Sequence, residues 1–273
     1  MTVYFGGLIF LVSIATANGR RLSKKSTVII DHDVDVTPDV IYGCGNTNGA
    51  FTTAKVESNG SELEIGLRAI IRGQGALDND NGTFTFPFSV TDIWNYDFTI
   101  NTEKQVGGIF ATNRITKSSK ITKSSKNTKS SKGAYASVLS DYSYELGIDK
   151  DPLMSTNFIK SDPISMDQAM CSSGSDALDH ALGTGMTTMD CSPGGRNEVG
   201  GTYPCGQMGC CNVYTNLLGE MTVLQQSWQP IWACNECDAN HFLVPGVYDV
   251  YFAALKKKSR EVVAKVQIRV QVV

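Results

Sequence analysis

The sequence predicts an all-β protein: an antiparallel β-sandwich, immunoglobulin-like or jelly-roll-like, with a cysteine-rich irregular insertion. Short segments of alternating apolar and polar residues recur along the chain, separated by turn sequences rich in Gly, Asn, Asp and Pro. Such alternation is typical of strands that bury one face. No segment shows a long apolar repeat of helical period, so the predicted strands have to pack against one another as sheets.

The strands can be placed from this alternation. Residues 62–72 alternate apolar side chains with Glu and Arg, which predicts a strand with one buried and one charged face. Residues 262–272 show the cleanest alternation. Further strands are expected at 27–30, 84–88, 94–100, 142–148, 221–228 and 247–254. Asn81-Gly82 predicts a tight turn before residues 84–88, and the best helical candidate is short, at 175–182.

The N-terminal residues predict secretion. Residues 3–14 are apolar and uncharged, and the small residues Ala15-Thr16-Ala17 follow them, as in a signal peptide of residues 1–17. A buried N-terminal strand or helix is the alternative. The apolar run is shorter than the roughly 18 to 20 residues that span a bilayer, so we expect no membrane span. Residues 18–26 are expected to be processed or disordered, because Arg20-Arg21-Leu22 offers a second cleavage site.

We expect a single domain over residues 27–273, because all-β domains of this length are often single units. Two insertions interrupt it: a basic repeat at 114–132, and a cysteine-rich loop at 165–212 that is poor in apolar residues.

Eight cysteines are present, an even number that predicts a disulfide framework in a secreted chain. They are Cys44, Cys171, Cys191, Cys205, Cys210, Cys211, Cys234 and Cys237. Cys234, Cys237 and His241 also have the spacing of a zinc site, but an oxidising compartment favours disulfides. The pairing is not deducible from the sequence.

The basic insertion is a hexapeptide repeat. The sequence (Ile/Asn)-Thr-Lys-Ser-Ser-Lys occurs three times in tandem, and this composition cannot form a core, so we expect a flexible arm. Residues 114–132 carry +7, so the rest of a chain of net charge −3 carries −10. The arm therefore either serves as a solubilising linker or binds polyanions. The predicted binding residues are Lys117, Lys120, Lys123, Lys126, Lys129 and Lys132.

Nucleic acid would fit the charge of the arm equally well, but secretion argues against it, and no nucleic-acid partner is expected. The expected partners are anionic polysaccharide, silica or another matrix polyanion. The Ser-Ser pairs of the repeat also offer phosphorylation sites.

Metal sites receive weaker support. Asp31, Asp33 and Asp35 would share one face of an extended strand, and calcium prefers such oxygen ligands. A solvated acidic segment is the simpler interpretation. Asp78–Gly82 resembles the start of an EF-hand loop, but Ser89 stands where the bidentate Glu belongs, so we expect a hairpin turn. No cofactor is predicted, and calcium and zinc stay alternatives.

Catalysis also receives little support. The chain has three histidines, His32, His180 and His241. Asp179-His180 lies near Ser175, but a catalytic triad is defined by spatial geometry. The usual hydrolase and metalloprotease signatures do not occur in the sequence. We assign no catalytic residue, and a secreted hydrolase or metal-dependent enzyme remains the alternative function. Two N-glycosylation sequons begin at Asn59 and Asn81, both at predicted turns.

Several short motifs resemble a family of secreted bacterial proteins that are sorted by exosortase through PEP-CTERM-type tails. These motifs are Ile41-Tyr42-Gly43, residues 45–52, residues 65–69, residues 94–98, Gln225-Gln226-Ser227-Trp228 and residues 245–251. The resemblance covers most of residues 40–273. It implies a surface or matrix role and no catalytic residues, and this sequence lacks the sorting tail.

The Lys-Ser repeat is similar to segments of diatom silaffins, which are silica-associated cell-wall proteins. Those precursors have processing sites that Arg20-Arg21-Leu22 resembles. This resemblance implies a silica- or cell-wall-associated matrix protein as another alternative. The leading hypothesis is a secreted structural or binding protein of the cell surface or extracellular matrix, whose basic arm contacts a polyanion. The oligomeric state is not predicted.

Overall fold

The structure is a computed structural model that describes part of the chain. The described residues are 27–38, 47–58, 61–71, 74, 77, 79, 81–88, 94–102, 137–152, 155–164, 181–183, 215–233, 237 and 241–273. The predicted signal peptide (1–17), the segment 18–26 and the basic repeat (114–132) lie outside the described residues. Of the predicted cysteine-rich loop (165–212), residues 181–183 are described.

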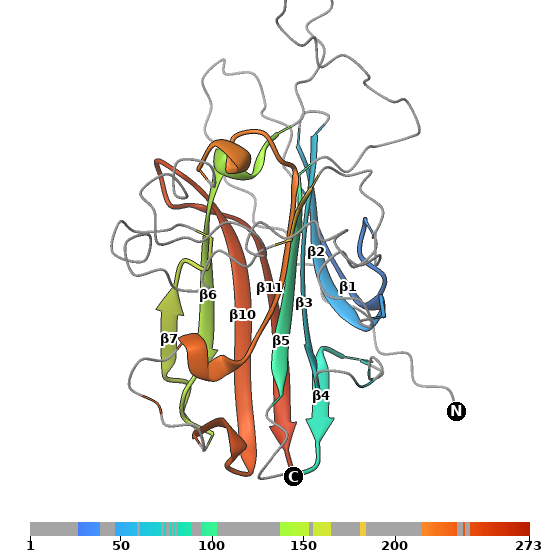
Figure 1. Cartoon of the computed structure of the whole chain (residues 1–273), viewed down its shortest axis with the longest axis vertical. Coiled ribbons are helices and arrows are strands. Elements are labelled where there is room, and N and C mark those ends of the chain that lie inside the picture. Colours follow the sequence, from blue (N-terminus) through green and yellow to red (C-terminus); the bar gives the residue numbers. More distant parts are fainter. Residues whose placement is uncertain are drawn as a thin grey trace, which may run out of the picture.

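The described residues form an all-β protein with two sheets, as the alternation predicts (Figure 1). The six-stranded sheet has, in spatial order, β1 (Thr27–Val34), β2 (Phe51–Ser58), β3 (Ser61–Ile70), β5 (Asn95–Asn101), β9 (Val223–Trp228) and β8 (Ala181–Gly183). The five-stranded sheet has β4 (Thr83–Phe86), β11 (Val262–Val272), β10 (Gly246–Lys256), β6 (Tyr142–Asp149) and β7 (Phe158–Ser161). The described helical segments are the 3-10 turns η1 (Leu139–Asp141), η3 (Pro230–Ala233) and η4 (His241–Leu243), and one α-helical turn at 215–218.

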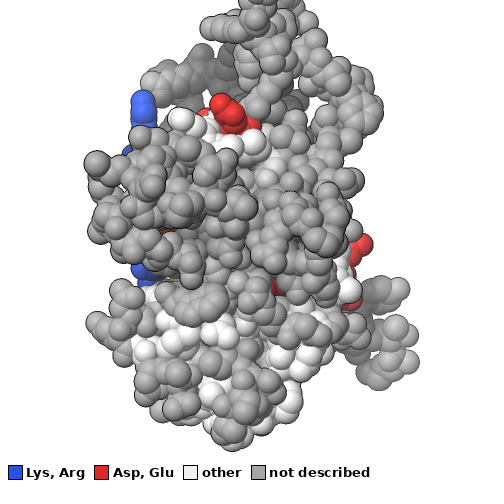
Figure 2. All heavy atoms as spheres, viewed as in Figure 1, with Lys and Arg blue, Asp and Glu red and all other residues white. Residues whose placement is uncertain are grey.

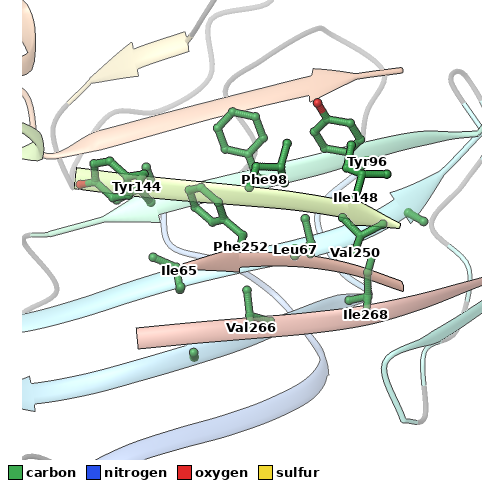
Figure 3. Packing of buried hydrophobic residues seen from close by; sticks show 14 of the residues in the cluster. Ile65, Leu67, Tyr96, Phe98, Tyr144, Ile148, Val250, Phe252, Val266 and Ile268 are labelled. Carbon is green, nitrogen blue, oxygen red and sulfur yellow. The ribbon is translucent and has the colours of Figure 1, made fainter. Parts of the chain in front are cut away.

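One hydrophobic core lies between the two sheets (Figure 3). The ring of Phe98 on β5 lies 5.2 Å from the ring of Phe252 on β10, and Tyr144 on β6 stacks on Phe252 at 5.9 Å. Trp94 extends this core, because its indole N–H donates to the carbonyl oxygen of Phe242 over 3.2 Å. The apolar faces of both sheets are therefore removed from water by the same contact.

Strand β11 shows how the sequence alternation produces this arrangement. Ala264, Val266, Ile268 and the following alternate residues to Val272 are buried, while the polar residues between them face outward. β11 pairs antiparallel with β10 along almost its whole length. β11 therefore has one apolar and one solvated face, as predicted for a half-buried strand.

The pairing of β4 differs from the prediction. Asn81-Gly82 does form a turn, with Gly82 at φ +71°, and β4 follows it. The turn is not part of a hairpin, because β3 and β4 belong to different sheets. β4 instead pairs in parallel with β11, and the Arg269 N–H donates to the carbonyl oxygen of Gly82 over 2.7 Å. One of the two sheets is thus mixed rather than purely antiparallel.

Two further predictions are wrong in part. Residues 175–182 were the best helical candidate, but Ala181 and Leu182 belong to β8, which pairs with β9. These residues also fall inside the loop 165–212, for which irregular structure is predicted. Both side chains are buried against the six-stranded sheet, so burial and pairing with β9 override the local composition here.

Replacing Phe98 tests the shared core. Phe98→Ala should lower the free energy of unfolding by about 3–5 kcal/mol, because the ring is fully buried between the sheets and its removal leaves a cavity. Denaturant unfolding followed by circular dichroism measures the change. Val262→Ala is the control, because this side chain is 53% exposed and should change stability by less than about 0.5 kcal/mol. Equal effects of the two substitutions would contradict a core centred on Phe98.

Candidate functional site: a cationic end of the two sheets

The six lysines predicted to bind polyanions lie outside the described residues, but the residues that flank their segment are described. The Thr102 hydroxyl donates to the carbonyl oxygen of Ser137 over 2.6 Å. The Thr102 N–H also donates to Thr222 over 2.8 Å. The segment 103–136, which contains the repeat, therefore leaves and rejoins the described structure at one point. We call Thr102 and Ser137 the arm base.

A second basic element lies at the same end of the molecule. The turn between β10 and β11 reads Lys256-Lys257-Lys258-Ser259-Arg260, and all five residues are exposed. We call residues 256–260 the basic turn. Lys256 pairs with Tyr142, the residue that directly follows η1. Because Ser137 lies two residues before η1, the basic turn and the arm base share one end of the two sheets (Figure 1).

The backbone of the basic turn is held by hydrogen bonds. The Lys256 N–H donates to Glu261 over 2.9 Å, and the Arg260 N–H donates to Lys256 over 2.9 Å. Arg260 adopts φ +57°, which closes the turn. Its side chain donates to the Ser143 hydroxyl over 2.9 Å. These hydrogen bonds therefore fix the conformation of the basic turn.

Two of its cations are not neutralised by the described residues. Lys256 pairs with Glu261 at 2.8 Å, and Arg260 lies 3.7 Å from Glu145. Lys257 and Lys258 are exposed and form no ion pair with any residue that the structure describes. Figure 2 shows basic atoms at the upper left, the corner at which the β10–β11 turn lies in Figure 1, and acidic atoms at the top of the same view. Exposed, unpaired ammonium groups are available to an anionic ligand.

Sequence reasoning missed the basic turn. Its signal was nevertheless present, because four cations within five residues stand between two clearly alternating strands. A charge run at the tip of a hairpin is exposed by necessity.

Beside the turn, Tyr251 organises charges on the outer face of the five-stranded sheet. Its hydroxyl donates to a Glu145 oxygen over 2.6 Å. The Lys265 ammonium lies 4.1 Å from the centre of its ring, within cation–π range. Gly147 leaves room for the ring, since a Cβ there would lie 2.1 Å from it. The Tyr251 hydrogen bond and the nearby cations Lys160 and Arg260 hold the pKa of Glu145 below its usual range.

The outer face of the six-stranded sheet differs from the prediction. The charged face of residues 62–72 was expected to meet solvent, but Glu64 and Arg68 are fully buried. Arg68 Nε lies 2.8 Å from Asp97 Oδ2, and its Nη1 donates to the carbonyl oxygens of Thr47 and Gly49 over 2.8 and 2.7 Å. These contacts pair the guanidinium with Asp97 and fasten residues 47–49 over the sheet.

The calcium alternative at Asp31, Asp33 and Asp35 is not supported by the backbone of this segment. A bulge follows Asp31, and Asp33 adopts φ +53°, so Asp31, Asp33 and Asp35 do not keep the simple alternation of an extended strand. Asp31 forms an ion pair with Lys55 at 2.9 Å. His32 Nδ1 lies 3.1 Å from the Thr52 hydroxyl. Within the described residues, no group of three or more His, Cys, Asp or Glu side chains could hold a metal ion.

Two residues of the motif with zinc-like spacing, Cys237 and His241, are described, and both form other contacts. Cys237 is disulfide-bonded, and His241 Nε2 lies 2.7 Å from the carbonyl oxygen of Lys150. The other seven cysteines lie outside the described residues, so the disulfide framework stays a prediction. Ser175, Asp179 and His180 lie outside them as well.

Of the two sequon asparagines, the structure describes one. Asn81 is exposed in the turn before β4, which suits a glycan acceptor, whereas Asn59 lies outside the described residues. No helix in the described part of the chain is long and apolar enough to cross a bilayer.

Comparison with protein-family models, curated proteins and solved structures finds no match for this chain. The resemblances to exosortase-sorted proteins and to silaffins therefore stay predictions. What the structure itself provides is a basic turn beside the base of a lysine-rich segment.

Breaking the buried ion pair should destabilise the fold. Asp97→Asn and Arg68→Met should each lower the free energy of unfolding by about 3–5 kcal/mol, because each leaves a charge or a polar group buried without its partner. The double variant should lose less than the sum of the two. Denaturant unfolding provides the comparison. Arg269→Met is the matched control, because its ion pair with Asp249 is exposed and contributes less than about 1 kcal/mol. Additive losses would contradict direct coupling.

The carboxyl group of Glu145 offers a pH test. Its lowered pKa means that ionised Glu145 stabilises the fold above its ordinary value of 4.5, and that this stabilisation is lost as the pH falls through the lowered pKa. Tyr251→Phe removes the main cause, so the pKa of Glu145 should rise, as measured by NMR titration of its carboxyl resonance. Lys160→Gln should raise it less, because this lysine is exposed. A larger effect of Lys160→Gln would refute the assignment to Tyr251.

Proposed function

We propose that this chain is a secreted binding protein of the cell surface or extracellular matrix that uses its cationic end to bind a polyanion. The ligand class is anionic polysaccharide, silica or another matrix polyanion. One observation carries the proposal: the basic turn and the base of the lysine-rich segment lie at the same end of the two sheets.

Charge spacing supports a polymeric ligand. The repeat places a lysine at every third residue over 117–132, and Lys257 and Lys258 add exposed cations on the fold itself. A polyanion carries charge along its length, so it gains from several modest contacts at once. A small anion would need a concave site with convergent polar groups.

The finer fold assignment belongs to the same proposal. We propose an immunoglobulin-like or jelly-roll-like β-sandwich in which disulfides stabilise the insertion at 165–212. The predicted signal peptide and the exposed Asn81 sequon fit an extracellular protein. The resemblance to exosortase-sorted surface proteins points to the same compartment.

One feature of the repeat makes silica a candidate among these partners. Each hexapeptide places a Ser-Ser pair between lysines. Phosphorylation of these serines would add close to two negative charges per residue and make the arm zwitterionic, which resembles the Lys-Ser segments of silaffins. We therefore include silica precipitation in the test.

Binding to heparin, a sulfated polysaccharide, tests the proposal by titration calorimetry at low and high salt. The full chain should bind, and more weakly at high salt because ions screen exposed charges. Replacing the six repeat lysines by Gln should abolish most of the affinity. Lys257→Gln with Lys258→Gln should weaken binding about 3- to 10-fold, as expected for two exposed charge contacts.

Three controls separate the possible outcomes. Arg269→Gln removes a cation that pairs with Asp249 on β10, beside Thr83 of β4, and should leave the affinity unchanged. A shuffled 114–132 segment should bind heparin normally if charge alone matters. Silica precipitation from silicic acid by the same variants shows whether silica needs the repeat order. A protein that binds neither heparin nor silica, or that binds equally well without the repeat lysines, would overturn the proposal.

A further inference from the structure

Strand β1 leaves one edge of the six-stranded sheet open. It is the last strand in the order β1-β2-β3-β5-β9-β8, and its described pairing is with β2. Its side chains Val28, Ile29 and Ile30 are 46%, 48% and 46% exposed. Because successive side chains of a strand point to opposite faces, apolar surface is open on both faces of β1.

This edge lacks the usual protection against strand addition. Thr27–Asp31 pairs regularly with β2, residue for residue, from Thr27 opposite Glu57 to Asp31 opposite Thr53. Within that stretch there is no Pro, no Lys and no bulge, which are the devices that blunt free edges. The irregularity begins after Asp31. Five residues of regular edge, with three apolar residues at their centre, are therefore available to another strand.

The charges that flank β1 indicate which strand pairs with its free edge and in which direction. In the sequence, Lys24 and Lys25 precede β1, while Asp33 stands near its far end; Asp31 already pairs with Lys55. Antiparallel alignment of two copies sets the basic end of one beside the acidic end of the other. Parallel alignment would set like charges together, which is unfavourable.

We propose that two copies of this chain pair antiparallel through β1, joining their six-stranded sheets into one continuous sheet. The register is centred on Ile29, so that Ile29 of each copy faces Ile29 of the other and Val28 faces Ile30. This register keeps the regular stretch Thr27–Asp31 fully paired. It is isologous, as closed dimers are, and it does not depend on polyanion binding.

Sedimentation velocity on the full chain tests the dimer over about 5–200 µM, the range expected for a small strand-to-strand interface. The wild type should shift from monomer to dimer. Ile29→Lys sets two ammonium groups opposite each other at the two-fold axis and should raise the dissociation constant at least about tenfold. Val262→Lys is the matched control, because it introduces the same charge at an exposed site on β11 and should leave the dimer intact.

A charge pair tests the register. Val28→Lys combined with Ile30→Lys places like charges opposite one another and should abolish the dimer. Val28→Glu combined with Ile30→Lys places opposite charges together and should restore it. Circular dichroism confirms that each variant is folded as a monomer.

Three results would overturn the proposal. The wild type could remain monomeric throughout the range, with or without capture of an unrelated extended peptide at this edge. Ile29→Lys could dimerise like the wild type, which would place the interface elsewhere. The Glu/Lys variant could fail to restore the dimer, which would refute the register centred on Ile29.

Discussion

The guanidinium of Arg68 lies between the carboxylate of Asp97 and the carbonyl oxygens of Thr47 and Gly49, with no exposure to solvent. This contact ties β3 to β5 and to the segment that leads into β2. With residues 47–49 fastened over the sheet, Phe51 joins Val36, Ala181 and Val223 in a second, smaller apolar cluster. β3 and β5 are therefore buried on both faces along almost their whole length, whereas the edge strand β1 is exposed.

The two sheets differ in where their charged side chains lie. The six-stranded sheet uses its ionisable side chains internally, as Glu64 does when it accepts the Thr37 N–H over 3.2 Å. On the five-stranded sheet, β11 exposes Lys265 and Arg269 on its outer face, and further cations lie in the β10–β11 turn.

The strands predicted most accurately are those with one solvated face. β11 follows the period-two pattern because its outward residues meet water, whereas β10 and β6 are buried on both faces over much of their length. β3 has the same pattern, but its Glu64 and Arg68 are buried, because partners far away in sequence satisfy them. The parallel pairing of β4 with β11 and the bulge after Asp31 also depend on distant residues. The sequence predicts the lysine-rich segment as a candidate binding site. The position of the basic turn beside the arm base follows from the strand pairing alone.

The hydrogen bond between Thr102 and Ser137 has an evolutionary consequence. Because the two ends of the inserted segment meet, the fold is insensitive to how much chain lies between them. The entropy of closing a flexible loop grows slowly, by only about 0.6 kcal/mol for each doubling of its length. Gain or loss of a hexapeptide unit would therefore leave the two sheets almost equally stable. Each unit added or removed would change the total charge by two lysines while the scaffold stays the same.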